Sequence, residues 1–341
     1  MHIFQKIDQI RKDIDKHRPF DTGIQKTLQE QLRIEWTYNS NAIEGNTLTL
    51  GETAFFLREG LTSEGKPLQD YLEAKNHAEA IDHLQDIIAQ KRPITEHLIK
   101  SLHGVLMKGM DFTVAKDARG QLIHKPLHVG EYKKQPNHVL TLSGKIHKYV
   151  NPLHVRDEME ELVKRLSTSK QLHPVERAAI FHYRFVSIHP FDDGNGRMSR
   201  LLMNLMLMRD GYYPCIIQHA HRRRYIETLE ETDSTKDDSL FVKFVGQELL
   251  STEQKVLEIL QGKSVPLTQQ TTKLNSMQRT ERIMHVLRTA SHPLSIGQIA
   301  ELLPELKRPT LKKDLEQLVA KKLLHIQGKG SGVIYNALKK N

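Results

Sequence analysis

Residues 189–200 read HPFDDGNGRMSR and lie between two patterns that are typical of buried helices. The preceding helix is expected over residues 174–188, where apolar side chains recur at helical spacing. Pro190 ends it, because a residue that precedes proline is pushed out of the helical region. The next helix is expected to begin near Gly196 and to end at Gly211, where glycine suits the C′ position. A glycine-rich loop therefore connects two buried helices and leads into a helix N-terminus.

The start of the second helix combines several features of an anion-binding site. Its first amide N–H groups have no acceptor within the helix, and the helix dipole adds positive potential there. Gly194 and Gly196 allow the backbone to approach a phosphate closely. Arg197 and Arg200 are three residues apart, so they share a helix face and reach the same anion. The loop is therefore predicted to bind phosphate.

Two further side chains of the loop indicate its chemistry. Asp193 is a carboxylate in an otherwise cationic environment, and Mg²⁺ between it and phosphate oxygens would remove the repulsion. His189 is the nearby side chain that titrates near neutral pH without help, which makes it the candidate general base. The loop supplies no nucleophile, so the attacking group must come from another molecule. These residues predict a transferase that uses a nucleoside triphosphate.

The loop matches the HPFx[D/E]GNGRxxR signature of the Fic (Fido) family of protein adenylyltransferases, and the chain resembles this family over residues 37–244. The resemblance implies a mainly α fold, with a Fic-type helical core and a β-hairpin flap. It implies transfer of AMP from ATP and Mg²⁺ to a Ser, Thr or Tyr hydroxyl, with His189 as the base and Asp193 as the metal ligand. It also implies phosphate contacts from Gly194, Asn195, Gly196, Arg197 and Arg200.

The flap is expected at residues 138–148, which alternate and turn as a hairpin does. The preceding residues, Gly130 to Lys133, resemble the family strand that leads to this flap. In the family, the flap holds the target peptide in extended form by main-chain pairing. The resemblance places the flap tip near the nucleotide, with the residues Lys145, Ile146, His147 and Lys148.

Residues 224–233 resemble the family helix that closes the adenine pocket. Tyr225 would be an aromatic wall of this pocket, and an ordinary packed tyrosine explains the residue equally well. Asp233 stands where relatives often have Asn, so its contact with adenine stays open. Both residues are candidates for nucleotide binding.

The segment SNAIEGN, residues 40–46, ends a helix that is expected over residues 25–43. Glu44 therefore lies at a helix C-terminus, where the dipole disfavours an anion. The segment resembles the family's [ST]xxxE[GN] inhibitory motif, in which the Glu pairs with the second signature arginine, here Arg200. An exposed Glu at a frayed helix end is the alternative. The inhibitory candidates are Ser40, Glu44 and Gly45.

The basic excess of the chain is concentrated in its C-terminal part. The formal net charge is +9, of which residues 276–341 carry +7 and residues 1–275 only +2. In the C-terminal part, a helix, a helix-turn-helix and a glycine-tipped hairpin predict a small winged-helix (α+β) domain. Basic residues within 307–329 lie where a major-groove reader would contact DNA, and a protein partner is the alternative.

Composition excludes several other classes of protein. Cys215 is the only cysteine, which excludes a disulfide scaffold and a Cys-rich zinc site and favours a reducing compartment. The longest apolar run, residues 201–208, is too short to span a bilayer. The first residues lack the apolar region of a signal peptide. We therefore expect a cytoplasmic protein without membrane contact.

These features predict an autoinhibited protein adenylyltransferase that modifies a hydroxyl side chain of a target protein or of itself. Two alternatives stay open: an enzyme that removes AMP or transfers another phosphate-linked group, and a DNA-binding regulator whose Fic core senses nucleotide. Relatives often dimerise, so the resemblance also allows a homodimer. The expected organisation is an N-terminal helical region (1–92), a catalytic core (93–250), a helix end with a linker (251–275) and the winged helix (276–341).

Overall fold

The structure is a computed structural model, and it divides the chain into two compact units, Met1–Ser264 and Val265–Asn341. Each unit has its own buried apolar core. The boundary falls inside the segment 251–275 that was expected to connect them. The residues that the structure describes are 3–116, 121–140, 144, 146–169, 171–263, 279–290, 293–303, 306, 308–321, 323–328 and 333–337.

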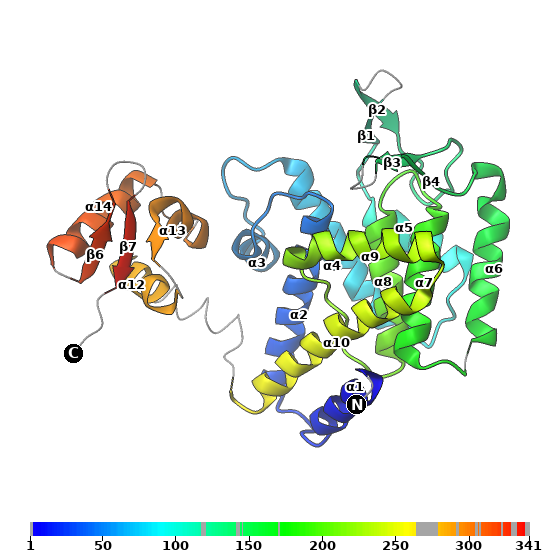
Figure 1. The fold of residues 1–341 in the computed structure, drawn as a ribbon, viewed down its shortest axis with the longest axis horizontal. Helices are drawn as coiled ribbons and strands as arrows, with labels where there is room; N and C mark the ends of the chain where they lie inside the picture. The colour runs from blue at the N-terminus through cyan, green and yellow to red at the C-terminus, as the bar shows by residue number, and fades with distance from the viewer. Residues whose placement is uncertain are drawn as a thin grey trace. The chain divides into compact units, whose positions relative to one another are not determined.

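The first unit is a bundle of α-helices around a central pair (Figure 1). The central pair is α7 (Pro174–Ile188) and α8 (Asn195–Arg209), which pack against each other. The helices that pack against this pair are α2 (Thr22–Ile43), α4 (Leu68–Ala89), α5 (Glu96–Leu106), α6 (Val155–Thr168) and α10 (Asp238–Leu260). The unit is completed by α1 (Ile3–Asp15), α3 (Leu50–Glu59), α9 (Arg222–Thr235) and the 3₁₀ turns η1 (Pro152–His154) and η2 (His219–His221).

The central helices bury apolar side chains on several of their faces. Leu201, Leu202 and Leu205 of α8 are fully buried, as is Phe185 of α7. Each side chain of this kind contributes about 1.5–3 kcal/mol when it is fully buried, so this pair forms the centre of the core. The expected sequence of helix, glycine-rich loop and helix is confirmed.

Two small hairpins project from this bundle (Figure 1). The flap hairpin consists of β3 (His138–Leu140) and β4 (Ile146–Lys148), paired antiparallel as the sequence predicts. The other hairpin, β1 (Phe112–Lys116) with β2 (Leu122–Pro126), was not expected. Residues 141–143 and Lys145 of the flap lie outside the described residues.

The expectation of a strand from Gly130 to Lys133 is wrong. Gly130 has φ of 77° and lies in a turn between β2 and β3. A left-handed glycine breaks the extended backbone that a strand requires, so this segment crosses the end of the site as an irregular loop.

The second unit has the element order of a winged helix. Its described residues include the helices α12 (Arg279–Thr289), α13 (Ile296–Leu302) and α14 (Arg308–Ala320). They pack with a three-stranded antiparallel sheet of order β5-β7-β6, which consists of β5 (Leu294–Ser295), β7 (Ile334–Ala337) and β6 (Leu324–Gln327). Ser295 caps α13 through a capping box with Gln298, as its position predicts. The short strand β5 was not predicted.

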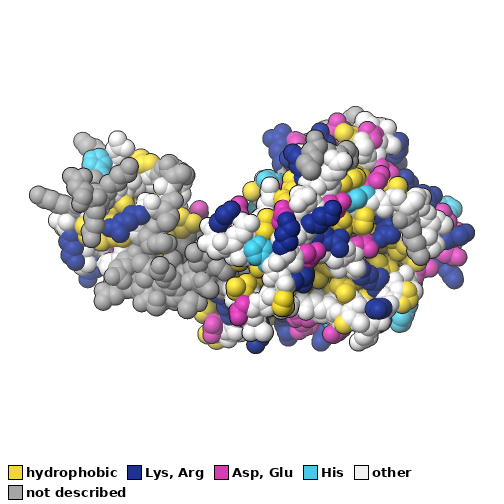
Figure 2. Space-filling view, turned by 90° about the horizontal axis from the view of Figure 1, so that it is seen from below, with side chains coloured by type: hydrophobic (Ala, Val, Ile, Leu, Met, Phe, Trp, Pro, Cys, Tyr) yellow, Lys and Arg dark blue, Asp and Glu magenta, His cyan; other side chains and the backbone are white. Residues whose placement is uncertain are grey.

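Charges of both signs are interspersed over the face of the first unit that Figure 2 presents. This distribution agrees with the small net charge of residues 1–275. Among the described helices, none is both long enough and apolar enough to cross a membrane.

Candidate active site

His189 lies at the turn between α7 and the signature loop, which comprises residues 189–194. Its amide donates to the Phe185 carbonyl at 3.0 Å, and its φ of 53° turns the chain out of α7. The imidazole stacks on the ring of Tyr149, with centroids 3.8 Å apart and an interplanar angle of 12°. Tyr149 directly follows β4, so the end of the flap fixes the plane of the candidate base.

Burial of the ring and then the charge of Lys133 lower the pKa of His189 to about 3, although the Val186 backbone and Asp193 oppose this shift. The imidazole is therefore neutral at pH 7 and has a lone pair available. A neutral imidazole is the protonation state that a general base requires.

Hydrogen bonds from neighbouring side chains fix the shape of the signature loop. Asn195 accepts from the Phe191 amide and donates to the Phe191 carbonyl, each at 2.9 Å. His103 of α5 lies 3.1 Å from the Asp193 carbonyl and accepts the Gly130 amide at 2.9 Å. The side chain of Asn195 is thus engaged with the loop itself, and the expected phosphate contact of this residue is left to its backbone amide.

The other side of the loop is attached to the segment between β2 and β3. The Lys133 amide and the Asn137 side chain donate to loop carbonyls at 2.8 and 3.0 Å. Asp192 accepts from His128 Nδ1 at 2.8 Å and lies 3.2 Å from Lys125 Nζ. Burial raises the pKa of Asp192, but these two partners hold it below its ordinary value. This aspartate therefore anchors the loop and is not free to bind a ligand.

The first turn of α8 is the expected anion site, and a carboxylate of the protein lies over it. A Cβ atom built on Gly196 would overlap Oε1 of Glu44. Glu44 caps the C-terminus of α2, and Gly45 follows with φ of 102°. The dipole of α2 disfavours the Glu44 carboxylate at the C-terminus of that helix. The N-terminus of α8 attracts the same carboxylate and offsets this effect.

Glu44 and Ser40 together engage Arg200. Nη2 of Arg200 donates to Glu44 Oε1 at 2.7 Å and to the Ser40 carbonyl at 2.8 Å, while Nε donates to Ser40 Oγ at 3.0 Å. Burial lowers the pKa of Arg200, but the charge of Glu44 and then Tyr225 hold it above its ordinary value. The segment 40–46 thus occupies donors of the second signature arginine.

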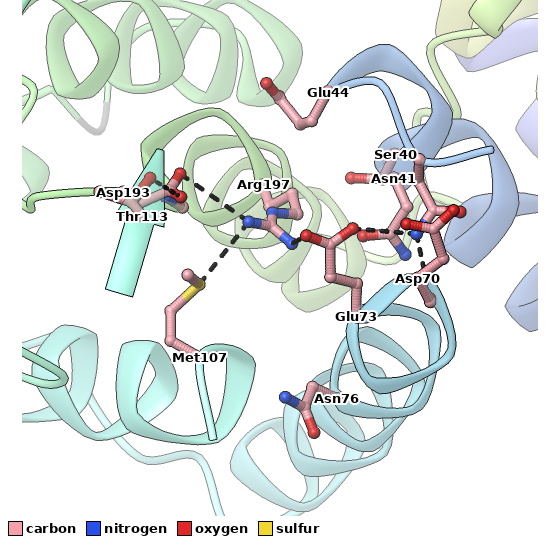
Figure 3. Close-up of polar contacts among 12 residues, drawn as sticks. Ser40, Asn41, Glu44, Asp70, Glu73, Asn76, Met107, Thr113, Asp193 and Arg197 are labelled. Carbon is pink, nitrogen blue, oxygen red and sulfur yellow. Dashed lines mark hydrogen bonds and ion pairs between the residues drawn. The ribbon is translucent and has the colours of Figure 1, made fainter. Parts of the chain in front are cut away.

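Arg197 lies between Asp193 and Glu73, close to Met107 (Figure 3). Its Nη1 is 3.4 Å from Glu73 Oε1, and its Nη2 is 3.9 Å from Asp193 Oδ1 and 3.7 Å from Met107 Sδ. The side chain is 3% exposed. Within the described part of the chain, Nε and Nη1 donate no hydrogen bond. A buried guanidinium with unused donors is suited to an anionic ligand.

Asp193 is the carboxylate of the signature loop that is open to a ligand. Its side chain is 42% exposed, whereas that of Asp192 is 1% exposed. It accepts from the Gly194 amide at 2.5 Å and from the Thr113 hydroxyl at 2.8 Å. The described residues include no group of three or more His, Cys, Asp or Glu that could hold a metal ion. One exposed carboxylate suits Mg²⁺, which keeps several waters and binds phosphate oxygens.

Tyr225 is a packed core residue in this structure, which favours the second of its two interpretations. Its side chain is 2% exposed and lies among Phe241, Phe244 and His182. Its hydroxyl is 3.0 Å from His182 Nε2, and its ring centroid is 5.9 Å from the guanidinium carbon of Arg200. The ring is therefore enclosed by aromatic neighbours and lies near Arg200, while its role toward adenine stays a prediction.

One flap candidate, His147, lies close to Asp233 of α9. Asp233 accepts from Tyr183 at 3.3 Å and from Lys236 at 2.9 Å, and its carboxylate is 3.6 Å from His147 Nδ1. The side chains of Ile146 and Lys148 are exposed. The contact between His147 and Asp233 therefore connects the flap to α9, and Lys145 lies outside the described residues.

Several residues that build the site were not singled out from the sequence. Each reaches the site by a contact between segments that are distant in the chain, which local patterns do not reveal. The exception is Asp192, because an acid beside Asp193 in the signature is a local signal. The residues are Asn46, Glu73, His103, Thr113, Lys133, Asn137, Tyr149 and Asp192.

Known proteins share this fold. Residues 93–207 match the Fic/DOC family. A Fic-domain signaling protein from Bacteroides thetaiotaomicron is 31% identical, and the match covers 76% of this chain and 98% of that one with a TM-score of 0.68. A Fic family protein from Desulfovibrio desulfuricans shares the fold over 99% of this chain and 96% of that one, with a TM-score of 0.59 and 22% identity.

Among curated proteins, a protein adenylyltransferase Fic from Culex quinquefasciatus is 31% identical over 244 residues, which are 71% of this chain and 45% of that protein. The chain thus spans about half the length of the curated relatives that it matches. The fold and the site define a helical protein in which a glycine-rich signature loop leads into a buried helix. The chain belongs to the Fic/DOC family.

Proposed function

We propose that the chain is an autoinhibited protein adenylyltransferase, which transfers AMP from ATP to a hydroxyl side chain of a target protein or of itself. The observation that carries the proposal is the position of Glu44. Its carboxylate lies over the first turn of α8 and is bonded to Arg200, so it marks the place of an anionic ligand. The names of the curated relatives support the same activity.

In the proposed reaction, His189 takes the proton of the target hydroxyl while the hydroxyl oxygen bonds to the α-phosphorus of ATP. The bond from the α-phosphorus to the bridging oxygen breaks, and pyrophosphate leaves with its electron pair. Arg197, Arg200 and the first amides of α8 bind the phosphates and hold them in line. Mg²⁺ bound at Asp193 would neutralise charge on the phosphates.

Glu44 inhibits this reaction by competing with the phosphates. It takes a donor of Arg200 in a 2.7 Å hydrogen bond, and it lies where the start of α8 would receive a phosphate oxygen. A second anion at the same place would meet like-charge repulsion. Displacement of Glu44 would therefore be needed before ATP binds productively.

The target is proposed to dock in extended form along the flap, residues 138–148. Val139 and Ile146 are large apolar side chains that are 46% and 63% exposed there. The flap has two strands, so their outer edges carry backbone groups that an added strand would pair. A segment of this chain itself would dock by the same chemistry.

The test is AMP transfer from α-³²P-labelled ATP by the Glu44→Gly protein in a lysate, followed by mass spectrometry of the labelled product. A hydrogen bond to a charged group is worth about 1.5–3 kcal/mol, so loss of the competing carboxylate should raise transfer by about tenfold or more. His189→Ala in the same background should abolish it. Glu64→Gly, an exposed glutamate in a loop, is the matched control and should leave transfer unchanged. Absence of transfer by Glu44→Gly would overturn the proposal.

Removal of AMP is the second candidate, and the exposure of Glu44 favours it. Its side chain is 39% exposed, which leaves room for a water molecule at the carboxylate. In that case the wild-type protein should release AMP from a target that Glu44→Gly has modified, and Glu44→Gly should not. The product masses separate the two activities.

Binding of duplex DNA by the second unit is proposed for the basic face of α14. Arg308, Lys312 and Lys313 are exposed at the start of this helix, where a winged helix contacts the major groove. Lys307 and Lys329, which were also expected to contribute, lie outside the described residues. A regulator that only senses nucleotide would keep this DNA binding and its biological output after His189→Ala.

A further inference from the structure

Arg197 has a partly buried acidic neighbour that belongs neither to the signature nor to the segment 40–46. Glu73 projects from α4 toward Arg197 (Figure 3), with Oε1 at 3.4 Å from Nη1. The two side chains are 14% and 3% exposed. A guanidinium buried this deeply requires a counter-charge. Asp193 lies farther away, at 3.9 Å, and is the carboxylate that is open to a metal ion.

Glu73 is itself oriented by Asn46. The Asn46 amide donates to Glu73 Oε2 at 2.9 Å and to the Asp70 carbonyl at 3.0 Å. The next residue, Thr47, donates its amide and its hydroxyl to the Asp70 carboxylate at 2.8 and 2.5 Å. These contacts attach the loop after α2 to the first turn of α4 without involving Glu44. One oxygen of Glu73 is therefore held by Asn46, and the other is directed at Arg197.

The two acid–arginine pairs of the site differ in their geometry. Glu44 accepts a 2.7 Å hydrogen bond from Arg200 and lies over the start of α8. Glu73 lies 3.4 Å from Arg197 without forming a hydrogen bond, and Nε and Nη1 of that arginine keep their protons unused within the described part of the chain. Glu44 thus occupies the donors that a phosphate needs, whereas Glu73 neutralises a charge and leaves the donors free.

We propose that Glu73 is a positioning residue of the nucleotide site, which holds Arg197 in the orientation that binds the phosphates beyond the α-phosphate. The role rests on the proposed function, because it assumes that ATP binds at the start of α8. Glu73 acts through Arg197 and does not touch the nucleotide. Its loss should therefore weaken ATP more than AMP, because AMP lacks the outer phosphates.

The experiment measures the affinity of ATP and of AMP by calorimetry, with Mg²⁺, for the full chain. The parent carries Glu44→Gly to open the site and His189→Ala to prevent turnover. Adding Glu73→Gln keeps the shape of the side chain but removes its charge. It should weaken the binding of ATP about tenfold, because a displaced Arg197 would lose about one charged hydrogen bond to the phosphates, and it should leave the binding of AMP unchanged. Asn46→Ala, which keeps the charge but not its orientation, should weaken ATP by a smaller factor.

Glu79→Gln is the matched control. Glu79 lies on the same helix in an exposed pair with Lys75 at 3.7 Å, so its removal should change neither affinity. Equal losses of ATP and AMP in Glu73→Gln would indicate general distortion of the site and would overturn the proposal. Tighter ATP binding would also overturn it, because Glu73 would then compete with phosphate as Glu44 does. Unchanged ATP binding would have the same consequence.

Kinetics separate this inference from the proposed function. With His189 intact, Glu44→Gly combined with Glu73→Gln should show a KM for ATP about tenfold higher and a kcat within about twofold of the Glu44→Gly protein. If Glu44→Gly transfers no label but still binds ATP, and Glu73→Gln weakens that binding selectively, the proposed reaction fails and the positioning role stands.

Discussion

At the scale of single residues, the site is supported by a buried histidine that takes no part in the proposed chemistry. His182 of α7 lies 3.0 Å from both Ser199 Oγ and Tyr225 OH. Burial, and then the charge of Arg200, lower the pKa of His182 well below its ordinary value. The folded protein therefore keeps this imidazole neutral near Arg200, the arginine that is proposed to bind phosphate, and a protonated ring there would repel Arg200.

We expect the folded protein to lose stability as the pH falls below about 6.5, where the unfolded chain protonates His182 and the folded chain does not. The unfolded state then binds more protons than the folded state. His182 therefore lowers the free energy of unfolding by about 1.4 kcal/mol for each unit that the pH decreases. Urea unfolding at pH 7.5, 6.5 and 5.5 measures the slope. The slope of the free energy of unfolding against pH should decrease in His182→Asn by the equivalent of about one bound proton. It should stay the same in the exposed control His97→Asn. An undiminished slope in His182→Asn would contradict this assignment.

At the scale of elements, the proposed anion site at the start of α8 depends on the conformation of the loop before it. Gly194 has φ of 76°, and a Cβ atom there would lie 2.8 Å from Met107 Sδ, so only glycine fits. Asn195 then closes the loop through both backbone groups of Phe191. The helix therefore begins at a fixed point, and Arg197 and Arg200 follow in its first two turns.

Asn195→Ala should lower the free energy of unfolding by about 1–3 kcal/mol, because the buried Phe191 amide loses its acceptor. The Phe191 carbonyl keeps a partner, since Asn137 also donates to it at 3.0 Å. Thermal and urea unfolding measure the loss. Asn151→Ala removes an exposed cap of η1 and is the control, with an expected cost below that of Asn195→Ala. Equal costs would contradict the structural role given to Asn195.

The sequence predicts elements better than it predicts contacts between them. The α7–loop–α8 unit, the flap and the three helices of the second unit follow from periodicity, proline and glycine positions, because these signals are local. The short hairpin β1–β2 and the two-residue strand β5 carry too little pattern to detect. Glu73 could not be predicted, because its role depends on α4 packing beside α8. Tyr225 shows the same limit, since its burial depends on the packing of α9 against α10.

At the scale of the whole molecule, the two units are proposed to bind anions by different means. Residues 1–275, which include the first unit, have a net charge of +2, so the proposed affinity for phosphate is attributed to two arginines and one helix N-terminus and not to the overall field. The second unit, with +7 over residues 276–341, can attract a polyanion by charge alone. Such binding releases counterions, so it depends steeply on salt concentration.

Lys312→Ala combined with Lys313→Ala should therefore weaken binding of duplex DNA and reduce the slope of log K against log salt by about 2, one contact per lysine. Both side chains are exposed on α14 and distant in sequence from the signature, so AMP transfer by the Glu44→Gly protein should be unchanged.

The control variant removes two exposed lysines of the first unit, Lys108→Ala with Lys164→Ala, and should leave the slope of log K against log salt as it was. Fluorescence anisotropy between 50 and 200 mM salt, the range where such slopes are large, measures both proteins. If the wild-type chain binds no duplex, or if the two double variants share one slope, the basic face of α14 is not a DNA-binding surface, and a protein partner becomes the explanation for its charge.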